Sequence, residues 1–76
     1  RLPDSFVEPM KETWLTIDHP RGVTQHKVVA FIVAYAGFFQ QKVTQQVASE
    51  MTGVSRTSLS PKIKQYKKIL KEYLPQ

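Results

Sequence analysis

Apolar residues recur at intervals of three and four along most of the chain, the spacing that places them on one face of a helix. In the first such segment they are Phe6, Met10, Trp14 and Ile17. A capping box formed by Ser5 and Glu8 predicts the start of this helix, so that Pro9 lies in the first turn, where its missing amide hydrogen costs little. Pro20 disfavours helical geometry in the residue before it, and we expect the helix to end near Asp18.

The second segment is apolar in nearly every direction around a helix. Thr24 can cap it, and it runs to about Gly37 or Phe39. A helix without a polar face must be enclosed by the others, which predicts a central buried helix near residues 25–38. The apolar run from Val28 to Phe39 is about a dozen residues, whereas spanning a bilayer takes about twenty, so we expect no membrane association.

A helix, a glycine turn and the start of a second helix follow within a short stretch, Thr44–Leu59. Thr44 can cap the first helix, and Gly53 supplies the positive φ that a tight exit turn requires. Val54 then fills the angle between the helices, and Ser55 restarts a helix. The apolar face of the first of these helices is expected to comprise Val47, Ala48 and Met51.

The last segment keeps one apolar register to the end of the chain: Leu59, Ile63, Tyr66, Leu70, Tyr73 and Leu74. A second face of the same helix carries Lys64, Lys67, Lys68 and Lys71. Pro61 conflicts with a helix that starts at Ser55, because it would cost about 3 kcal/mol in the interior. Either the helix begins late, with Thr57 or Ser58 as its cap, or a single turn at 56–59 is followed by a helix capped by Ser60.

No segment has the alternating pattern of a strand, and the sequence therefore predicts an all-α fold. We expect a compact bundle of about four helices that contains a helix-turn-helix. Residues 1–76 form a single domain, which we expect to be a piece of a longer protein because no initiating methionine is present.

The composition argues against several classes of function. Without cysteine the chain has no thiolate ligand, and His19 and His26 match no zinc spacing, so no metal site or cofactor is expected. Three scattered glycines form no phosphate loop, and no serine stands in a recognisable nucleophile setting, so we expect neither an enzyme nor a small-molecule substrate. The absence of cysteine and of a signal peptide favours an intracellular location, in a prokaryotic cytoplasm or a nucleus.

The net charge of +5 is unevenly distributed. Residues 1–20 hold two basic and four acidic side chains, whereas residues 21–76 hold nine basic and two acidic ones. A positive field of this kind in a small domain favours a polyanion as partner. Together with the helix-turn-helix, it predicts binding to double-stranded DNA, in transcription, its regulation or another DNA transaction.

Within that hypothesis, the start of the second helix reads bases while lysines and helix N-termini hold phosphates. Arg56 is the candidate for a base contact, because a guanidinium can grip guanine in a bidentate manner. The shorter candidate contacts are Ser55, Thr57, Ser58 and Ser60. Gln45 and Gln46 are placed for a phosphate or an adenine, and the candidate phosphate ligands are Lys42, Lys62, Lys64 and Lys68.

These residues carry a resemblance to a known family. The segment from Glu8 to Leu74 resembles the second cyclin-like repeat of transcription factor TFIIB and its archaeal counterpart. The segments that carry the likeness are a buried helix at Lys27–Gly37, a Thr44-Gln45 helix start and a Gly53-Val54 turn nine residues after the threonine. The resemblance implies promoter DNA as the partner, contacted through Gln45, Ser55, Arg56 and Thr57.

A second, shorter resemblance is to the DNA-binding end of Fis and related bacterial regulators. The stretch from Gly53 to Tyr66 follows the Gly, Arg, Leu, Lys, Lys, Tyr order of that segment. Because Fis-type proteins act as dimers, this resemblance implies a homodimer.

The alternative from another class is a helical protein–protein interaction domain without nucleic-acid binding. It would use the Phe38-Phe39 corner or the apolar face of the last helix. Solvent exposure separates the two hypotheses. Contiguous exposed Phe38, Phe39, Tyr73 and Leu74 would favour the interaction domain, whereas their burial, with Arg56 and the lysines on one face, would favour DNA.

Overall fold

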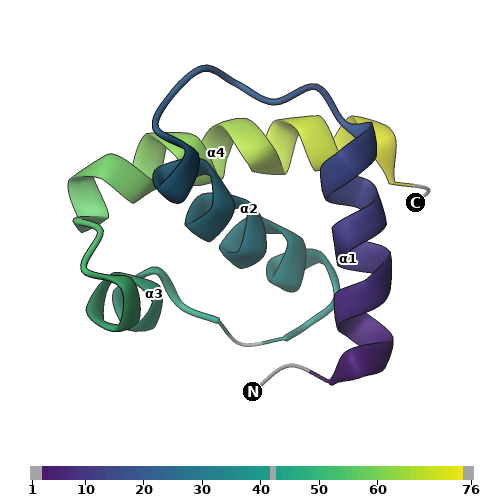
Figure 1. Cartoon of the computed structure of the whole chain (residues 1–76), viewed down its shortest axis with the longest axis horizontal. Helices are drawn as coiled ribbons and strands as arrows, with labels where there is room; N and C mark the ends of the chain where they lie inside the picture. Colours follow the sequence, from purple (N-terminus) through teal and green to yellow (C-terminus); the bar gives the residue numbers. More distant parts are fainter. Residues whose placement is uncertain (1–2, 42, 75–76) are drawn as a thin grey trace.

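The computed structural model describes residues 3–41 and 43–74, and this part of the chain folds into four α-helices without a strand. The helices are α1 (Asp4–Thr16), α2 (Thr24–Phe38), α3 (Gln45–Thr52) and α4 (Arg56–Tyr73). In Figure 1, α4 runs along one side of the molecule, α2 lies beneath it, and α1 and α3 stand at opposite ends. The predicted all-α bundle of four helices is therefore confirmed.

The central helix is α2, as its sequence predicts. Ala30, Ala34 and Ala36 are completely buried, and Phe31 and Tyr35 are nearly so. Small residues on this helix let neighbouring backbones approach it, and α2 packs mainly along α4. The partners that α4 contributes are also fully buried: Leu59, Tyr66 and Leu70.

An aromatic cluster joins the end of α1 to α2 and α4. The Trp14 ring lies 5.2 Å from Phe31 and 4.0 Å from His19, between ring centroids. His19 Nε2 lies 2.6 Å from the carbonyl oxygen of Trp14, which can only accept, so this nitrogen carries the proton. In the neutral ring Nδ1 then accepts from the Tyr66 hydroxyl at 2.7 Å. Burial raises the pKa of Tyr66 to about 12, which keeps this phenol protonated as the donor.

Two helix starts differ from the prediction. The capping box at Ser5 and Glu8 does not form; α1 begins at Asp4, and Pro3 precedes it without a side-chain cap. Consequently Pro9 is not in the first turn but sixth in the helix, where the backbone loses a hydrogen bond. Thr24 is the first residue of α2 rather than its cap, because Val23 occupies the extended position before it.

The start and end of α3 and the turn after it have the predicted local chemistry. The Thr44 hydroxyl accepts a hydrogen bond from the Val47 backbone at 3.1 Å, which caps α3. Gly53 ends that helix with φ of +78°, in the left-handed region that favours glycine. Val54 is 5% exposed and fills the angle between the helices. The Ser55 hydroxyl then accepts from the Ser58 backbone at 3.2 Å and caps α4.

The predicted apolar face of α3 is wrong for two of its three residues. Ala48 is buried, but Val47 and Met51 are 45% and 81% exposed. The helix has only eight residues and turns the side that holds Ala48 toward the core, while Val47 and Met51 lie on the adjoining side.

Both predicted ways of accommodating Pro61 are also wrong. The helix α4 begins at Arg56 and continues through Pro61, which is its sixth residue. Leu59 and Ile63 lie on either side of Pro61 and are both buried, so core packing holds the segment helical despite the missing hydrogen bond. Pro61 itself is exposed.

Candidate nucleic-acid interface

The continuity of α4 through Pro61 sets the geometry of the candidate site. With 3.6 residues per turn, Arg56, Lys64, Lys67 and Lys68 fall within about 120° of the helix circumference. All four are exposed. We call this set the basic flank. Lys71 continues the row at its C-terminal end and already has an interaction partner.

Arg56 lies at the N-terminal end of the basic flank. Its guanidinium has no hydrogen bond or ion pair within the described part of the chain. The backbone N–H groups of Arg56 and Thr57 also have no acceptor there, because the first N–H groups of a helix lack an intrahelical partner, whereas those of Ser58 and Leu59 bond to Ser55. A free guanidinium beside two free N–H groups at the positive end of a helix dipole is suited to an anionic oxygen.

Several predicted contact residues are occupied by the fold itself. Gln45 Nε2 donates to the carbonyl oxygen of Arg56 at 3.0 Å, which ties the start of α3 to the start of α4. Ser55 Oγ donates to Ser58 Oγ at 3.0 Å while capping the helix. Gln46 Nε2 donates to Glu50 Oε1 at 3.3 Å on the surface of α3. Gln45 and Ser55 thus build the corner between the two helices.

The predicted lysines divide into three groups. Lys64 and Lys68 lie on the basic flank. Lys62 lies on the other side of α4, where its Nζ donates to the carbonyl oxygen of Arg21, so its ammonium group holds the loop before α2. Lys42 lies outside the described residues. Thr57 is exposed beside Arg56, and Ser60 is half-buried between Arg56 and Lys64.

From the sequence, Lys67 is expected on the solvent face of the last helix but not among the contact residues. Its relation to Arg56 follows from helical spacing only when the register runs unbroken across Pro61. The two free N–H groups at the start of α4 are likewise found only when Ser55 is fixed as the cap.

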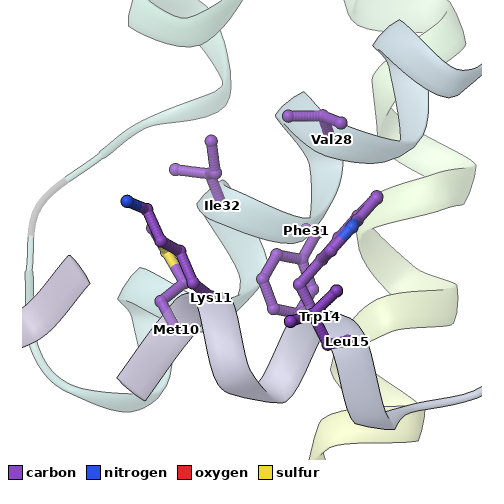
Figure 2. Close-up of a pocket in the computed structure, with 7 residues that line it drawn as sticks. All are labelled: Met10, Lys11, Trp14, Leu15, Val28, Phe31 and Ile32. Atoms are coloured by element: carbon purple, nitrogen blue, oxygen red, sulfur yellow. The ribbon is translucent and has the colours of Figure 1, made fainter. Parts of the chain in front are cut away.

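A second surface feature lies at the opposite end of the molecule. It is an apolar groove of about 420 Å³ between α1 and α2, and Figure 2 shows the seven side chains that line it: Met10, Lys11, Trp14, Leu15, Val28, Phe31 and Ile32. Leu15 is 82% exposed. Lys11 supplies its single charge and lies 3.8 Å from Glu8, between Nζ and Oε1.

The solvent exposure of the four apolar residues that separate the two hypotheses agrees in part with each of them. Phe38, Phe39 and Tyr73 are 37%, 44% and 46% exposed, whereas Leu74 is half-buried. They are not contiguous: the Phe39 ring packs on Phe6 near the start of α1, and Tyr73 lies beside Ile17 after its end. Of the described basic side chains, the four of the basic flank share one face of α4, whereas Lys62 lies on its other side.

Two further observations bear on partners. Within residues 3–41 and 43–74, no three His, Asp or Glu side chains gather in a way that could hold a metal ion. None of the described helices is long and apolar enough to span a membrane.

Comparisons with models of protein families, with curated proteins and with solved structures returned no match.

Proposed function

We propose that this chain is a duplex-DNA-binding domain, acting in transcription or another DNA transaction. It docks through the corner between α3 and α4 and through the basic flank. The observation that carries the proposal is the alignment of a free guanidinium and two free N–H groups at the start of α4 with three exposed lysines along the same side.

The residues divide the work by their surroundings. Arg56 is the base-reading residue, because its guanidinium is unpaired in the described structure and can take guanine O6 and N7 together. Lys64, Lys67 and Lys68 neutralise phosphates and fix the register of the domain on the duplex. Gln45, Ser55 and Ser58 act indirectly, by holding the N-terminus of α4 in place.

The resemblance to the second cyclin-like repeat of TFIIB supports the same function, since that repeat contacts promoter DNA with its helix-turn-helix. The likeness is carried by the Thr44-Gln45 start, the Gly53-Val54 turn and the buried helix at Lys27–Gly37. The Fis-type resemblance supports DNA as well, on the segment from Gly53 to Tyr66.

A salt titration of binding to random duplex DNA tests the proposal. Four phosphates neutralised by the basic flank predict that log affinity falls against log salt with a slope of about −3.6. Lys64→Ala should reduce the steepness of the slope by about 1. The matched control is Lys11→Ala, because Lys11 is also exposed but lies on α1 at the far end of the molecule. Absence of binding at low salt, or equal effects of both variants, would contradict the proposal.

Arg56 has its own test, which separates base reading from charge. After selection of a preferred site from a random library, Arg56→Ala should weaken that site more than random sequence, by a further factor of about 10. Arg56→Lys keeps the charge but not the bidentate geometry, and should behave like the alanine variant in discrimination. Equal losses on both DNAs would make Arg56 a phosphate contact.

The second candidate function is a protein–protein contact, and the groove between α1 and α2 favours it. A side chain as exposed as Leu15 beside an apolar groove is typical of an interaction surface. If the partner is a second copy of the chain, sedimentation equilibrium should detect a dimer that Leu15→Ser abolishes. A chain that stays monomeric at all concentrations would contradict the homodimer.

A further inference from the structure

A small pocket joins the C-terminal end of α2 to the basic flank. It has a volume of about 170 Å³ and is lined by Ala34, Gly37 and Phe38 of α2 and by Lys67 of α4. Three of its walls are apolar, and the fourth is a cation already assigned to phosphate binding. The pocket therefore lies at the edge of the proposed DNA surface.

Phe38 is not part of the aromatic core. The other aromatic residues of α2 and the turn after it, Phe31, Tyr35 and Phe39, make ring contacts with one another or with α1 and α4. Phe38 has no ring partner within residues 3–41 and 43–74, and 37% of its surface is exposed. The Phe38 side chain is therefore partly accessible and borders the pocket.

Gly37 keeps one side of the pocket open. A Cβ atom built on Gly37 would meet no atom within 4 Å, so that the backbone there faces open space. A flat ring can lie against such a surface and contact Phe38 from the same side. Lys67 borders this space, where an ammonium group can reach a phosphate attached to the ring.

We propose that this pocket receives one unpaired nucleobase, from a single-stranded extension of the bound duplex. On the extended DNA the base stacks on Phe38 over Gly37. Lys67, which neutralises a duplex phosphate on blunt DNA, then neutralises the phosphate that adjoins this base. Aromatic side chains bordering a positively charged surface recognise single strands in this way, without preference for sequence. This inference rests on the proposed function and adds a preferred substrate: a junction between duplex and single strand.

The position of the pocket sets the length of the extension. Arg56 and Lys67 are separated by eleven residues of helix, which is about 16 Å along the axis. A strand that advances about 3.4 Å per nucleotide covers this distance in about five nucleotides. An extension of six nucleotides therefore suffices, and both a 5′ and a 3′ extension are tested because the strand polarity is not fixed by the pocket.

The experiment compares a blunt duplex with the same duplex carrying each extension, for the wild type and two variants at position 38. Phe38→Leu keeps an apolar side chain but removes the π-face, and Phe38→Trp keeps the π-face. The wild type and Phe38→Trp should bind one extended duplex about tenfold more tightly than Phe38→Leu does, while blunt-duplex affinity is equal for all three. Circular dichroism verifies that each variant is folded.

A base analogue reports stacking directly. With 2-aminopurine at the fifth nucleotide of the extension, its fluorescence should change on binding the wild type and much less on binding Phe38→Leu. If Phe38→Leu binds the extended duplex as tightly as the wild type, or weakens blunt and extended DNA equally, the inference is overturned.

The proposed function and this inference fail in different ways. If the blunt duplex does not bind at low salt, the duplex-binding proposal is wrong. The pocket is then tested with the six-nucleotide single strand that carries 2-aminopurine, without a duplex. Binding of that strand with a fluorescence change that depends on Phe38 supports the pocket. If the strand does not bind, or binds without a fluorescence change that depends on Phe38, the inference is overturned.

Discussion

The two ends of the molecule differ in how far their polar groups are hydrogen-bonded within the fold. At the α1 end, His19 bonds through both ring nitrogens, to Trp14 and to Tyr66, and lies among aromatic rings. At the α3 end, some side chains are occupied by capping, whereas Arg56 and Thr57 project from the surface with unpaired groups. The first arrangement stabilises the fold and the second leaves groups available for a ligand. Because α4 contributes to both ends, substitutions along it can distinguish stability from binding.

The largest expected effect comes from Leu59, which ties the α3 end to the core. Leu59→Ala removes a completely buried side chain and should lower the free energy of unfolding by about 3 kcal/mol. A domain of this length is expected to have about 4 to 11 kcal/mol in total. Urea unfolding followed by circular dichroism measures the change. The exposed Val47→Ala should cost less than about 0.5 kcal/mol, and a larger loss would mean that α3 packs more extensively than its exposure indicates.

Alkaline pH should destabilise the α1 end through Tyr66. Its pKa is raised from 10.0 to about 12 in the folded chain, so the unfolded chain loses this proton first as the pH rises. The stabilisation is complete below pH 10.0 and is lost by about pH 12, a change of about 2 to 3 kcal/mol. Urea midpoints from pH 8 to 12 should therefore fall less steeply for Tyr66→Phe than for the wild type. If the urea midpoints of the two proteins fall in parallel, groups other than Tyr66 cause the loss of stability at alkaline pH.

Pro61→Ala should stabilise the chain by about 1 to 2 kcal/mol. Alanine restores an N–H that can donate to the carbonyl oxygen of Thr57, and part of the gain is offset by the greater freedom of alanine in the unfolded state. Pro9→Ala, also at the sixth position of its helix, should change stability in the same direction. Thermal unfolding measures both. A loss of stability in Pro61→Ala would show that the proline fits its site better than the helix geometry implies.

The smallest expected effect concerns the cap of α4. Ser55→Ala removes the acceptor for the Ser58 backbone and should cost about 1 kcal/mol. Ser60→Ala is the matched control, because the Ser60 hydroxyl has no hydrogen bond within the described structure, and should be nearly neutral. If both variants lose the same free energy of unfolding, the Ser55 cap contributes no more to stability than a serine hydroxyl without a hydrogen bond.

Some features fixed by local chemistry were predictable from the sequence, whereas the capping box of Ser5 and Glu8 and the Thr24 cap do not form. The Thr44 cap and the left-handed Gly53 each depend on one residue and its near neighbours, and both occur as predicted. The Ser55 cap was not predicted, because Pro61 indicated a later start of the last helix. The buried character of α2 was predictable too, because no polar face interrupts it. These features suffice for the fold class and for the helix–turn–helix order.

Features that depend on distant contacts were not predictable. Pro61 stays helical because Leu59 and Ile63 are anchored in the core, which local propensity does not reveal. Lys62 is occupied by the carbonyl oxygen of Arg21, forty-one residues away. The exposure of Met51 likewise follows from how little of α3 touches the core. For the candidate site, the sequence could name Arg56 but not the alignment of Lys67 with it, and the DNA-binding role of both stays a prediction.

The proline in α4 has one more consequence. Since Pro61 has no N–H, the carbonyl oxygen of Thr57 lacks the hydrogen bond that a regular helix would give it, one residue from Arg56. A bound surface that buries this oxygen must supply a hydrogen-bond donor or lose affinity. The exocyclic amino groups of cytosine and adenine are such donors, whereas phosphate oxygens are not. A main-chain atom would then discriminate between surfaces, in a way that substitutions of the Thr57 side chain leave intact.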